Sequence, residues 1–426
     1  AQTAFESGWR DMPPGQRAEL LHGLAKRIRD NVESIAQLET RNVGKPIGDA
    51  RWEADAGAKV FEYYAGSIGH LCGQTIPVAR GGFDFTLRQP MGVIAAITPW
   101  NFPFLIACWK VAPALAAGNS VVLKPASLTP LTALMLGQLA QEAGLPDGVL
   151  QVVPGSGSEA GNALATHPLV RKIGFTGSTE VGATIMKLAA DDIKRVSLEL
   201  GGKSPNIVFA DADWQRAAAE SPMSVFANTG QDCCARSRMF IEQSVFDGFV
   251  DQFVAATESL KIGDPMDEAT QVGPMVSAAQ RELSESHIAG ARDAGREIRT
   301  GGDRPNGGGF YLNPAVVTGV ETEDRAWREE IFGPVVCLRP FTDETEMLRE
   351  VNDTNFGLSG SVWSNDLSRA LRVARQVESG VISINSHSSV HTEAPFGGFK
   401  RSGLGRDLGM SAMEACTEVK NIYVGE

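Results

Sequence analysis

The regular alternation of short apolar runs with helical stretches between residues 92 and 200 is the feature that most constrains the fold. Each run is almost continuously apolar, as in GVIAAIT at 92–98, which is typical of parallel strands buried on both faces. The pattern therefore predicts an α/β fold around a parallel sheet. We expect strands at 92–98, 119–123, 149–153, 171–175 and 194–200, and helices at 103–117, 130–143, 158–166 and 179–190.

The alternation resumes after Gly201-Gly202, which predicts a second α/β unit. Here we expect strands at 206–209, 239–242, 334–338, 359–363 and 380–384, and helices at 213–227, 245–260, 344–353 and 366–378. Apolar residues at helical spacing predict two further helices ahead of both units, at 14–40 and about 50–70. The stretch 265–310 is richer in Gly, Pro and charge, and we expect it at the surface.

Composition narrows the classes of partner. A chain of 426 residues is long enough for two or three domains, and its net charge of -12 argues against nucleic acid or an anionic membrane as the main partner. The most apolar stretch, 102–117, is too short to span a bilayer. The 6 cysteines are sparse and neither cysteines nor histidines show metal-ligand spacing, so we expect no disulfide framework, no metal and a reducing, cytoplasmic location.

The first residues carry no signal-peptide pattern, because no basic segment precedes an apolar core. The chain also lacks an initiator Met and opens in the lead-in to a helix. We therefore expect a fragment or a chain that is missing its N-terminus.

Two glycine-rich turns between a strand and a helix are candidate nucleotide sites. Residues 155–160 (GSGSEA) fit the dinucleotide fingerprint GxGxxA, although a plain turn is an equally good interpretation. In the second turn, the free N–H groups at the helix start, together with Gly177 and Ser178, are suited to hold a pyrophosphate.

Cys233 and Cys234 lie in a glycine-containing loop after a predicted helix, where a thiol can be reached. A thiolate is a strong nucleophile once a base is near or its pKa falls. The alternative interpretation is a pair of inert cysteines.

Two further polar residues end apolar strands. Glu199 is a single carboxylate inside an apolar run, so desolvation should raise its pKa toward that of a general base; a structural ion pair with Lys203 or Arg195 is the alternative. Asn101 brings a neutral N–H donor to the carboxyl end of a strand, where it could stabilise an oxyanion. A turn-forming Asn is the alternative there.

Seven ordered motifs resemble those of the aldehyde dehydrogenase superfamily, and the resemblance runs from about residue 4 to 424. The motifs are TPWNFP, VVLKPAS, GFTGSTEVG, LELGGKSP, NTGQDCCARSR, EEIFGPV and PFGGFKRSG. The resemblance implies a Rossmann-like cofactor domain at 1–70 and 91–201 and a catalytic domain at 202–401. It also implies a β arm for oligomerisation at 71–90 and 402–426, and a homodimer or homotetramer. The strand around Asn421–Val424 could extend a neighbour's sheet, or it could be an ordinary edge strand.

The resemblance implies that NAD or NADP serves to oxidise a small-molecule aldehyde to its acid. Cys233 matches the nucleophile and Glu199 the general base, whereas Cys234 is a bystander. Asn101 and the Cys233 N–H resemble the oxyanion hole, and Lys110 resembles a lysine in a proton path.

The motifs also carry the implied binding residues. Glu330 and Phe332 resemble the contacts of the nicotinamide ribose and ring, Lys124 and Ser127 those of the adenosine ribose, and Gly177 and Ser178 the pyrophosphate turn. The full set expected at the cofactor is Thr98, Pro99, Trp100, Lys124, Ser127, Gly177, Ser178, Leu200, Glu330 and Phe332. The substrate pocket should contain Phe102, Ile106, Trp109, Asp232, His387 and Val390, the last two from the loop 386–394.

Two departures from the family pattern bear on the expectations. Several tens of family residues are absent before residue 1, although no named catalytic residue is lost. Ser127 stands where NAD-preferring members commonly have Glu, so we expect NADP to be tolerated. Asp232 could favour a cationic aldehyde, unless it points away or pairs with Arg236.

Two other functions compete with this interpretation. A CoA-acylating dehydrogenase usually lacks the carboxylate of Glu199, and a catalytically silent structural member has no need of Cys233, Glu199 and Asn101 together.

Overall fold

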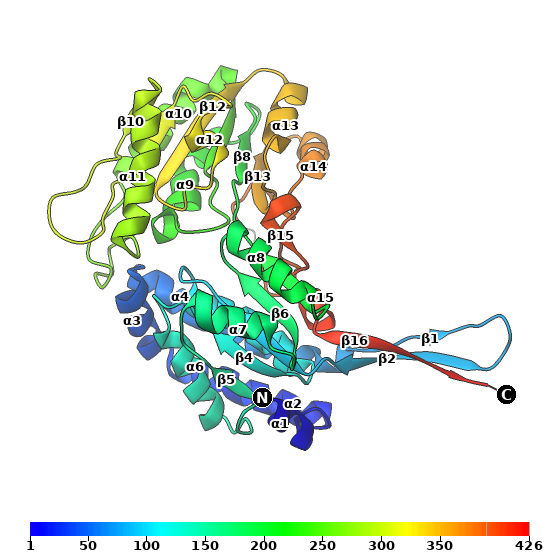
Figure 1. The fold of residues 1–426 in the computed structure, drawn as a ribbon. Coiled ribbons are helices and arrows are strands. Elements are labelled where there is room, and N and C mark those ends of the chain that lie inside the picture. The colour runs from blue at the N-terminus through cyan, green and yellow to red at the C-terminus, as the bar shows by residue number, and fades with distance from the viewer. Residues whose placement is uncertain (389, 426) are drawn as a thin grey trace.

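The computed structural model describes residues 1–388 and 390–425, which form two α/β lobes and a long arm (Figure 1). Ser389, in the loop expected at the substrate pocket, and Glu426, at the end of the expected arm, lie outside the described residues.

The first lobe is built on a six-stranded sheet that is parallel except for its edge strand β15, which runs antiparallel to β7. In spatial order its strands are β15 (Gly403–Leu404), β7 (Arg195–Glu199), β6 (Val170–Thr176), β3 (Val93–Ile97), β4 (Ser120–Lys124) and β5 (Leu150–Val152). The helices of this lobe are α1 (Gln2–Ala4), α2 (Pro14–Asp30), α3 (Val32–Val43), α4 (Ile47–Ser67), α5 (Pro103–Ala116), α6 (Leu131–Glu142), α7 (Asn162–Thr166) and α8 (Thr179–Ala190).

The central strand β3 shows why the run at 92–98 has to be apolar throughout. Ile94 and Ala96 belong to the core on the side of α2, α4 and α5, whereas Val93, Ala95 and Ile97 belong to the core on the side of α8. Successive strand residues point to opposite faces, and both faces are covered. The expected buried parallel sheet is confirmed.

The second lobe holds a seven-stranded sheet in which only β10 is antiparallel to its neighbour. In spatial order its strands are β10 (Glu297–Thr300), β11 (Ala315–Thr318), β12 (Val335–Phe341), β9 (Arg238–Glu242), β8 (Pro205–Val208), β13 (Ser359–Trp363) and β14 (Val381–Ile384). Its helices are α9 (Trp214–Phe226), α10 (Phe246–Glu258), α11 (Ala278–Asp293), α12 (Arg325–Arg328), α13 (Glu344–Asn352) and α14 (Leu367–Gln376).

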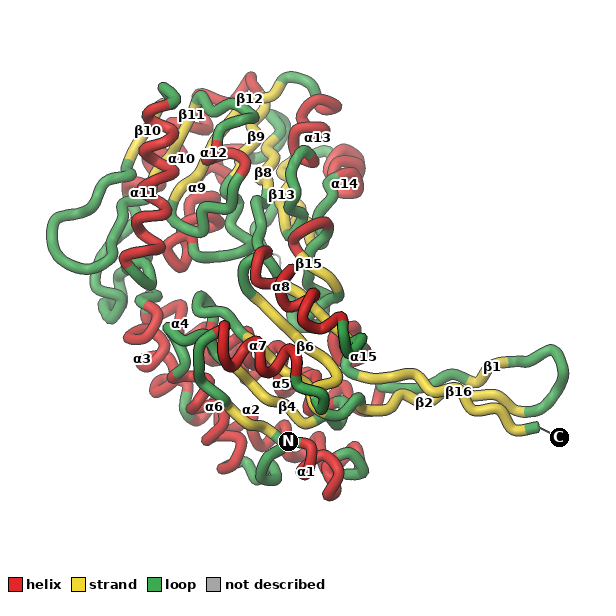
Figure 2. Tube along the Cα trace, viewed as in Figure 1, coloured by secondary structure: helices red, strands yellow, loops and turns green. Residues whose placement is uncertain are grey.

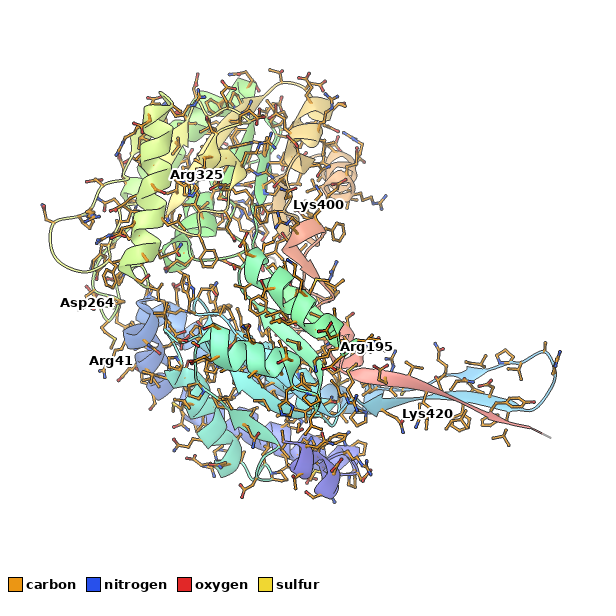
Figure 3. The ribbon with its side chains drawn as sticks, viewed as in Figure 1. Arg41, Arg195, Asp264, Arg325, Lys400 and Lys420 are labelled. Atoms are coloured by element: carbon orange, nitrogen blue, oxygen red, sulfur yellow. The ribbon has the colours of Figure 1, made fainter. Side chains whose placement is uncertain are left out.

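The arm is a three-stranded antiparallel sheet that projects away from both lobes (Figure 2). It joins two distant parts of the chain, because β2 (Phe83–Pro90) pairs with β1 (Thr75–Ile76) on one side and with β16 (Thr417–Val424) on the other. Strand β16 follows the short helix α15 (Gly409–Glu414). Arg195 lies at the root of the arm and Lys420 along it (Figure 3). The division of the chain into three domains stays a prediction.

Some predicted elements differ from the structure. The helix expected at 14–40 is two helices, because Asn31 leaves the helical conformation with φ -116°. The stretch 265–310 contains helix α11 and strand β10, neither of which was predicted, and β11 was also missed. The segment expected as a helix at 158–166 begins as a π-helical turn at Gly157–Gly161. Among the described residues, no helix combines the length and apolarity needed to cross a bilayer.

Candidate functional site

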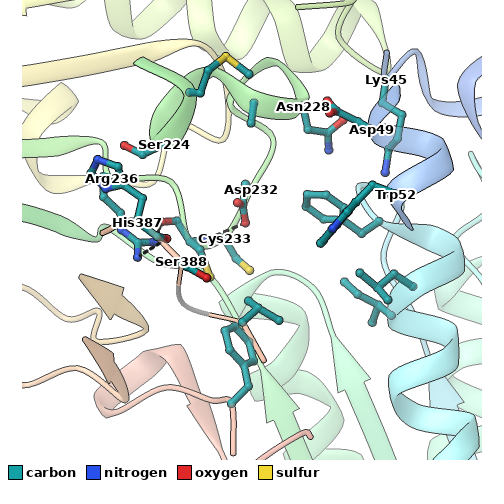
Figure 4. Close-up of a pocket in the computed structure, with 18 of the residues that line it drawn as sticks. Lys45, Asp49, Trp52, Ser224, Asn228, Asp232, Cys233, Arg236, His387 and Ser388 are labelled. Atoms are coloured by element: carbon teal, nitrogen blue, oxygen red, sulfur yellow. Dashed lines mark hydrogen bonds between the residues drawn. The ribbon is translucent and has the colours of Figure 1, made fainter. Parts of the chain in front are cut away.

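Two cavities meet at the side chain of Cys233. One has a volume of about 510 Å³ and the other about 290 Å³, and Cys233 and Thr176 line both. Figure 4 shows the larger cavity, with Cys233 between α4 on one side and the Arg236–His387 wall on the other. A group bound in either cavity therefore lies against the same residue, Cys233.

The loop that carries Cys233 is held by unusual backbone geometry after α9. Asn228 and Thr229 both have positive φ, at 50° and 58°, which non-glycine residues seldom adopt. A side chain at Gly230 would collide with the Gly333 carbonyl. The side-chain amide of Gln231 also holds this loop in place. Its Nε2 donates to Asn228 O at 3.0 Å, and its Oε1 accepts from Val276 N–H at 3.0 Å.

The Cys233 thiol is held in its neutral form. Hydrogen bonding with the Cys234 thiol raises the pKa of Cys233 well above the usual value, and desolvation adds to the effect. Asp232 contributes in the same direction through its charge. A thiolate therefore needs an added cation or a nearby base to form at neutral pH.

Glu199 ends β7 and lines the cavity that contains Cys233. Neither carboxyl oxygen has a hydrogen-bond partner within the described chain. Burial raises the pKa of Glu199 well above the usual value, and the charge of Asp407 raises it further. The alternative of a structural ion pair is wrong, since Lys203 donates to Ala326 O at 2.8 Å and Arg195 pairs with Glu418 at 3.0 Å.

Lys110 lies behind Glu199 in a buried ion pair with Asp407, at 2.8 Å. Both charges of this pair act on Glu199, and they oppose each other there. The Lys110–Asp407 pair therefore adjusts the proton affinity of Glu199 without contacting Cys233.

Asn101 follows strand β3 and is hydrogen-bonded to the loop that carries Cys233. Its Nδ2 donates to Gln231 O at 2.9 Å, and its backbone carbonyl accepts from Asn228 Nδ2 at 2.9 Å. The amide has a second N–H, and Asn101 lines the smaller cavity together with Cys233. A donor is thus fixed beside the thiol.

The smaller cavity contains most residues that were expected at the cofactor. It is lined by Pro99, Trp100, Gly177, Ser178, Leu200, Glu330 and Phe332. Close packing explains its glycines, because a side chain at Gly201 would collide with the Glu330 carboxyl and one at Gly202 with the Cys233 carbonyl. Phe332 has φ 53° and packs edge-on against Trp100, with ring centroids 5.2 Å apart.

These residues fit a dinucleotide. The Glu330 carboxyl is fixed by the Gly202 N–H at 2.9 Å, and burial raises its pKa to about 7. Its second oxygen is suited to accept from a ribose hydroxyl. Gly177 and Ser178 lie at the start of α8, where Ser178 accepts from Val181 N–H at 3.4 Å and the helix end favours a phosphate.

Three expected cofactor residues do not line this cavity. Thr98 and Lys124 are joined by a hydrogen bond of 3.1 Å between their backbones at the carboxyl ends of β3 and β4. Ser127 is exposed, and its hydroxyl donates to Gly155 O at 2.9 Å. Thr98, Lys124 and Ser127 follow or end strands at their carboxyl ends, which is the side on which open α/β sheets bind ligands.

All six residues expected at the substrate line the larger cavity, namely Phe102, Ile106, Trp109, Asp232, His387 and Val390. Asp232 faces this cavity and accepts the Cys234 N–H at 2.8 Å, so it does not point away. The imidazole of His387 is held by Ser221 and Ser361, at 3.1 and 3.2 Å, and burial lowers its pKa to about 3. His387 therefore stays neutral at physiological pH.

The comparisons with known proteins decide the family. The model described as "Aldehyde dehydrogenase family" matches residues 1–422.

This chain belongs to the aldehyde dehydrogenase family.

Its relatives within the family cover the whole chain. It is 44% identical to betaine aldehyde dehydrogenase 1 of Oryza sativa subsp. japonica, over 97% of this chain and 83% of that protein. It is 43% identical to phenylacetaldehyde dehydrogenase of Pseudomonas fluorescens, over 100% of this chain and 86% of that protein. The NAD+ complex of an aldehyde dehydrogenase from Bacillus cereus superposes with a TM-score of 0.98 at 40% identity, covering 100% of this chain and 87% of that one. The resemblance predicted from seven motifs is confirmed.

Several residues of this aldehyde dehydrogenase site were not predicted. Lys45, Asp49 and Trp52 line the larger cavity from the start of α4 and the loop before it (Figure 4). Asp407 comes from a turn near the C-terminus. No motif signalled them, because they reach the site only through the packing of α4 and α15 against α5.

Proposed function

We propose that this aldehyde dehydrogenase oxidises an aldehyde to its carboxylic acid with NAD(P)+, using Cys233 as the nucleophile and Glu199 as the general base. The observation that carries the proposal is that Cys233 lines both cavities while Glu199 lines one of them. Attack by Cys233, departure of a hydride from the carbon bound to its sulfur, and hydrolysis of the resulting thioester can then all occur at one place.

The first step is attack of the Cys233 sulfur on the aldehyde carbon. The carbonyl oxygen gains negative charge, and the amide of Asn101, fixed by Gln231 O, is placed to donate to it. A neutral resting thiol suits a nucleophile that releases its proton to the water of the cavity, and so attacks as a thiolate, only when a cation such as the nicotinamide ring would lie in the adjoining cavity.

When bound, NAD(P)+ would accept the hydride from the thiohemiacetal carbon. Glu330 and Phe332 would hold the nicotinamide end beside Cys233, and the start of α8 would hold the pyrophosphate. The NAD+ complex of the Bacillus cereus relative supports this choice of cofactor.

The second half of the reaction is hydrolysis of the Cys233 thioester. Glu199 would take a proton from water, and its raised pKa makes the carboxylate a stronger base than an exposed Glu. The charges of the Lys110–Asp407 pair behind it would act on Glu199 in opposite directions while it holds the proton.

Single-turnover and steady-state kinetics on two variants test this scheme. Cys233→Ala should lose turnover entirely, because no thiohemiacetal can form. Glu199→Gln should give one burst of reduced cofactor and a steady rate lowered by about 10²–10⁴-fold. A normal steady rate in Glu199→Gln would exclude that carboxylate. Product analysis with added CoA separates the rival reaction, since acyl-CoA instead of acid would make the enzyme an acylating one.

A further inference from the structure

Three potential metal ligands, one of which is the proposed nucleophile, lie close together. A carboxylate oxygen of Asp232 and the sulfur atoms of Cys233 and Cys234 all lie within 4.8 Å of one another. It is the one group of three or more such side chains found in residues 1–388 and 390–425. Asp232 and Cys233 face the open cavity in Figure 4.

We propose that a soft divalent cation, of the class of Cd²⁺ or Zn²⁺, binds across Cys233 and Cys234 with Asp232 as a third ligand, and reversibly blocks the nucleophile. The inhibitory effect rests on the proposed role of Cys233, whereas the binding does not. The cation is an added inhibitor and not a resident structural metal.

The geometry needs little change to form such a site. Tetrahedral sites with metal–sulfur bonds of about 2.3 Å hold their sulfur atoms about 3.8 Å apart. From the upper bound of 4.8 Å, a closure of about 1 Å is needed, which side-chain rotation of two cysteines supplies. The fourth position faces the cavity of about 510 Å³, where water can complete the coordination.

The charges also balance. Binding displaces a proton from each thiol to solvent, so that two thiols and one cation give a dithiolate complex and two protons. With the Asp232 carboxylate the ligands carry three negative charges against the two positive charges of the cation. The buried guanidinium of Arg236 supplies the remaining positive charge, since its Nη1 donates to Cys234 O at 2.6 Å.

A disulfide is a poorer use of the same two sulfur atoms. Adjacent residues have Cα atoms about 3.8 Å apart, below the separation of about 4.4–6.8 Å that disulfides normally span. The vicinal pair is therefore better suited to chelate a thiophilic ion, for which thiolates are the preferred ligands.

Titration of the chelator-treated full chain with CdCl₂ tests the proposal. We expect about one Cd²⁺ per chain by elemental analysis, an ultraviolet thiolate-to-cadmium absorption band, and loss of aldehyde oxidation that EDTA reverses. Cys234→Ala should lose the band and weaken Cd²⁺ binding by more than the 10–100-fold that loss of an outer-shell partner costs. Cys72→Ala, which removes an exposed thiol, is the matched control and should bind as the parent does.

The results of these experiments can refute the cation site and the proposed function independently of each other. Unchanged Cd²⁺ affinity in Cys234→Ala, or loss of affinity in Cys72→Ala, would overturn the cation site. Normal aldehyde oxidation without any Cd²⁺ binding would overturn it as well. A chain that binds one Cd²⁺ through Cys234 but oxidises no aldehyde would support the cation site and refute the proposed function.

Discussion

Glu199, the proposed general base, shows how a buried carboxyl group lowers the stability of the fold at neutral pH. Its folded-state pKa lies well above the unfolded value of 4.5 because burial disfavours the charged form. Between these two values the folded state binds more protons than the unfolded state, so stability falls as pH rises, by at most about 1.4 kcal/mol per pH unit. Below 4.5 the protonated group carries no such penalty.

Glu199→Gln should therefore raise the melting temperature relative to the parent chain at pH 8 and converge with it near pH 4. Thermal unfolding across this range measures the difference. Glu6→Gln, an exposed change, is the control and should alter the melting temperature little. A Glu199→Gln effect that grows toward acid pH would mean that Glu199 is charged and stabilised in the folded state.

Ser127 gives a second prediction at the scale of one residue. Its exposed side chain brings no charge to the expected adenosine ribose site. Ser127→Glu should lower kcat/KM for NADP+ by about 10–100-fold through repulsion of the 2′-phosphate, at a cost of about 1–3 kcal/mol. The NAD+ value should change only a few-fold. Spectrophotometric assays with each cofactor measure these two kcat/KM values, and Ser127→Gln is the control for side-chain size. Strict rejection of NADP+ by the parent chain would contradict the argument.

The predictability of single residues depended on how local their chemistry is. Cys233, Glu199 and Asn101 each stand in a short motif at the end of a predicted helix or strand, so their place could be inferred from sequence. Asp407 gave no signal because its partner Lys110 is far away in the chain, and Lys45 gave none because it stands in a loop that only packing brings against Glu53 of α4. Which buried charges pair with each other depends on how the chain packs, so it cannot be inferred from the spacing of residues in the sequence.

At the scale of elements, a buried ion cluster fixes the start of α5. Lys45 pairs with Glu53 and lies 3.9 Å from Glu39, and it also lies 4.3 Å from the centre of the Phe102 ring. The two carboxylates accept from the first N–H groups of the helix, Glu53 from Leu105 at 3.0 Å and Glu39 from Phe104 at 3.4 Å. Carboxyl oxygens satisfy N–H groups that have no partner within the helix, and here they position the helix that follows Asn101.

Lys45→Met should destabilise the chain by about 3 kcal/mol, because it leaves two buried carboxyl groups without their cation. Urea unfolding midpoints measure the loss of stability. Lys26→Met, which removes an exposed pair with Asp30 at 2.6 Å, is the control and should cost under about 1 kcal/mol. Equal costs for both variants would show that the buried cluster has no special role.

Elements were predicted well where apolar residues dominate and poorly where they do not. Helix α8 was predicted at its observed bounds, 179–190, and β13 at 359–363. Helix α11 was missed because its buried face contains Ser284, His287 and Ala291 beside a single large apolar residue, Ile288. Such a face gives little hydrophobic periodicity, and tertiary packing supplies what the pattern lacks.

At the scale of the whole molecule, the arm projects beyond the helices of both lobes (Figure 1), and one of its faces carries exposed apolar side chains. Phe83, Leu87 and Val424 are 53%, 39% and 52% exposed, and strand pairing places Phe83 opposite Val424 and Leu87 opposite Lys420 on this face. Strand β16 is also the outer strand of the arm, and β14 is the outer strand of the seven-stranded sheet. Free edges and an exposed apolar face support the expected assembly of at least two copies.

The double variant Phe83→Asp with Leu87→Asp should therefore dissociate the assembly into folded monomers. Each carboxylate would have to be buried in the contact between copies, and only the one at position 87 lies opposite a cation, Lys420, so the one at position 83 would stay without a partner across the strands. Sedimentation velocity measures the mass, and circular dichroism establishes that the lobes stay folded. Leu367→Asp changes an equally apolar, 65% exposed residue on α14, so it should leave the mass unchanged. If the double variant keeps the parent mass, the arm face does not hold the copies together, and the exposed edge of β14 becomes the next surface to test.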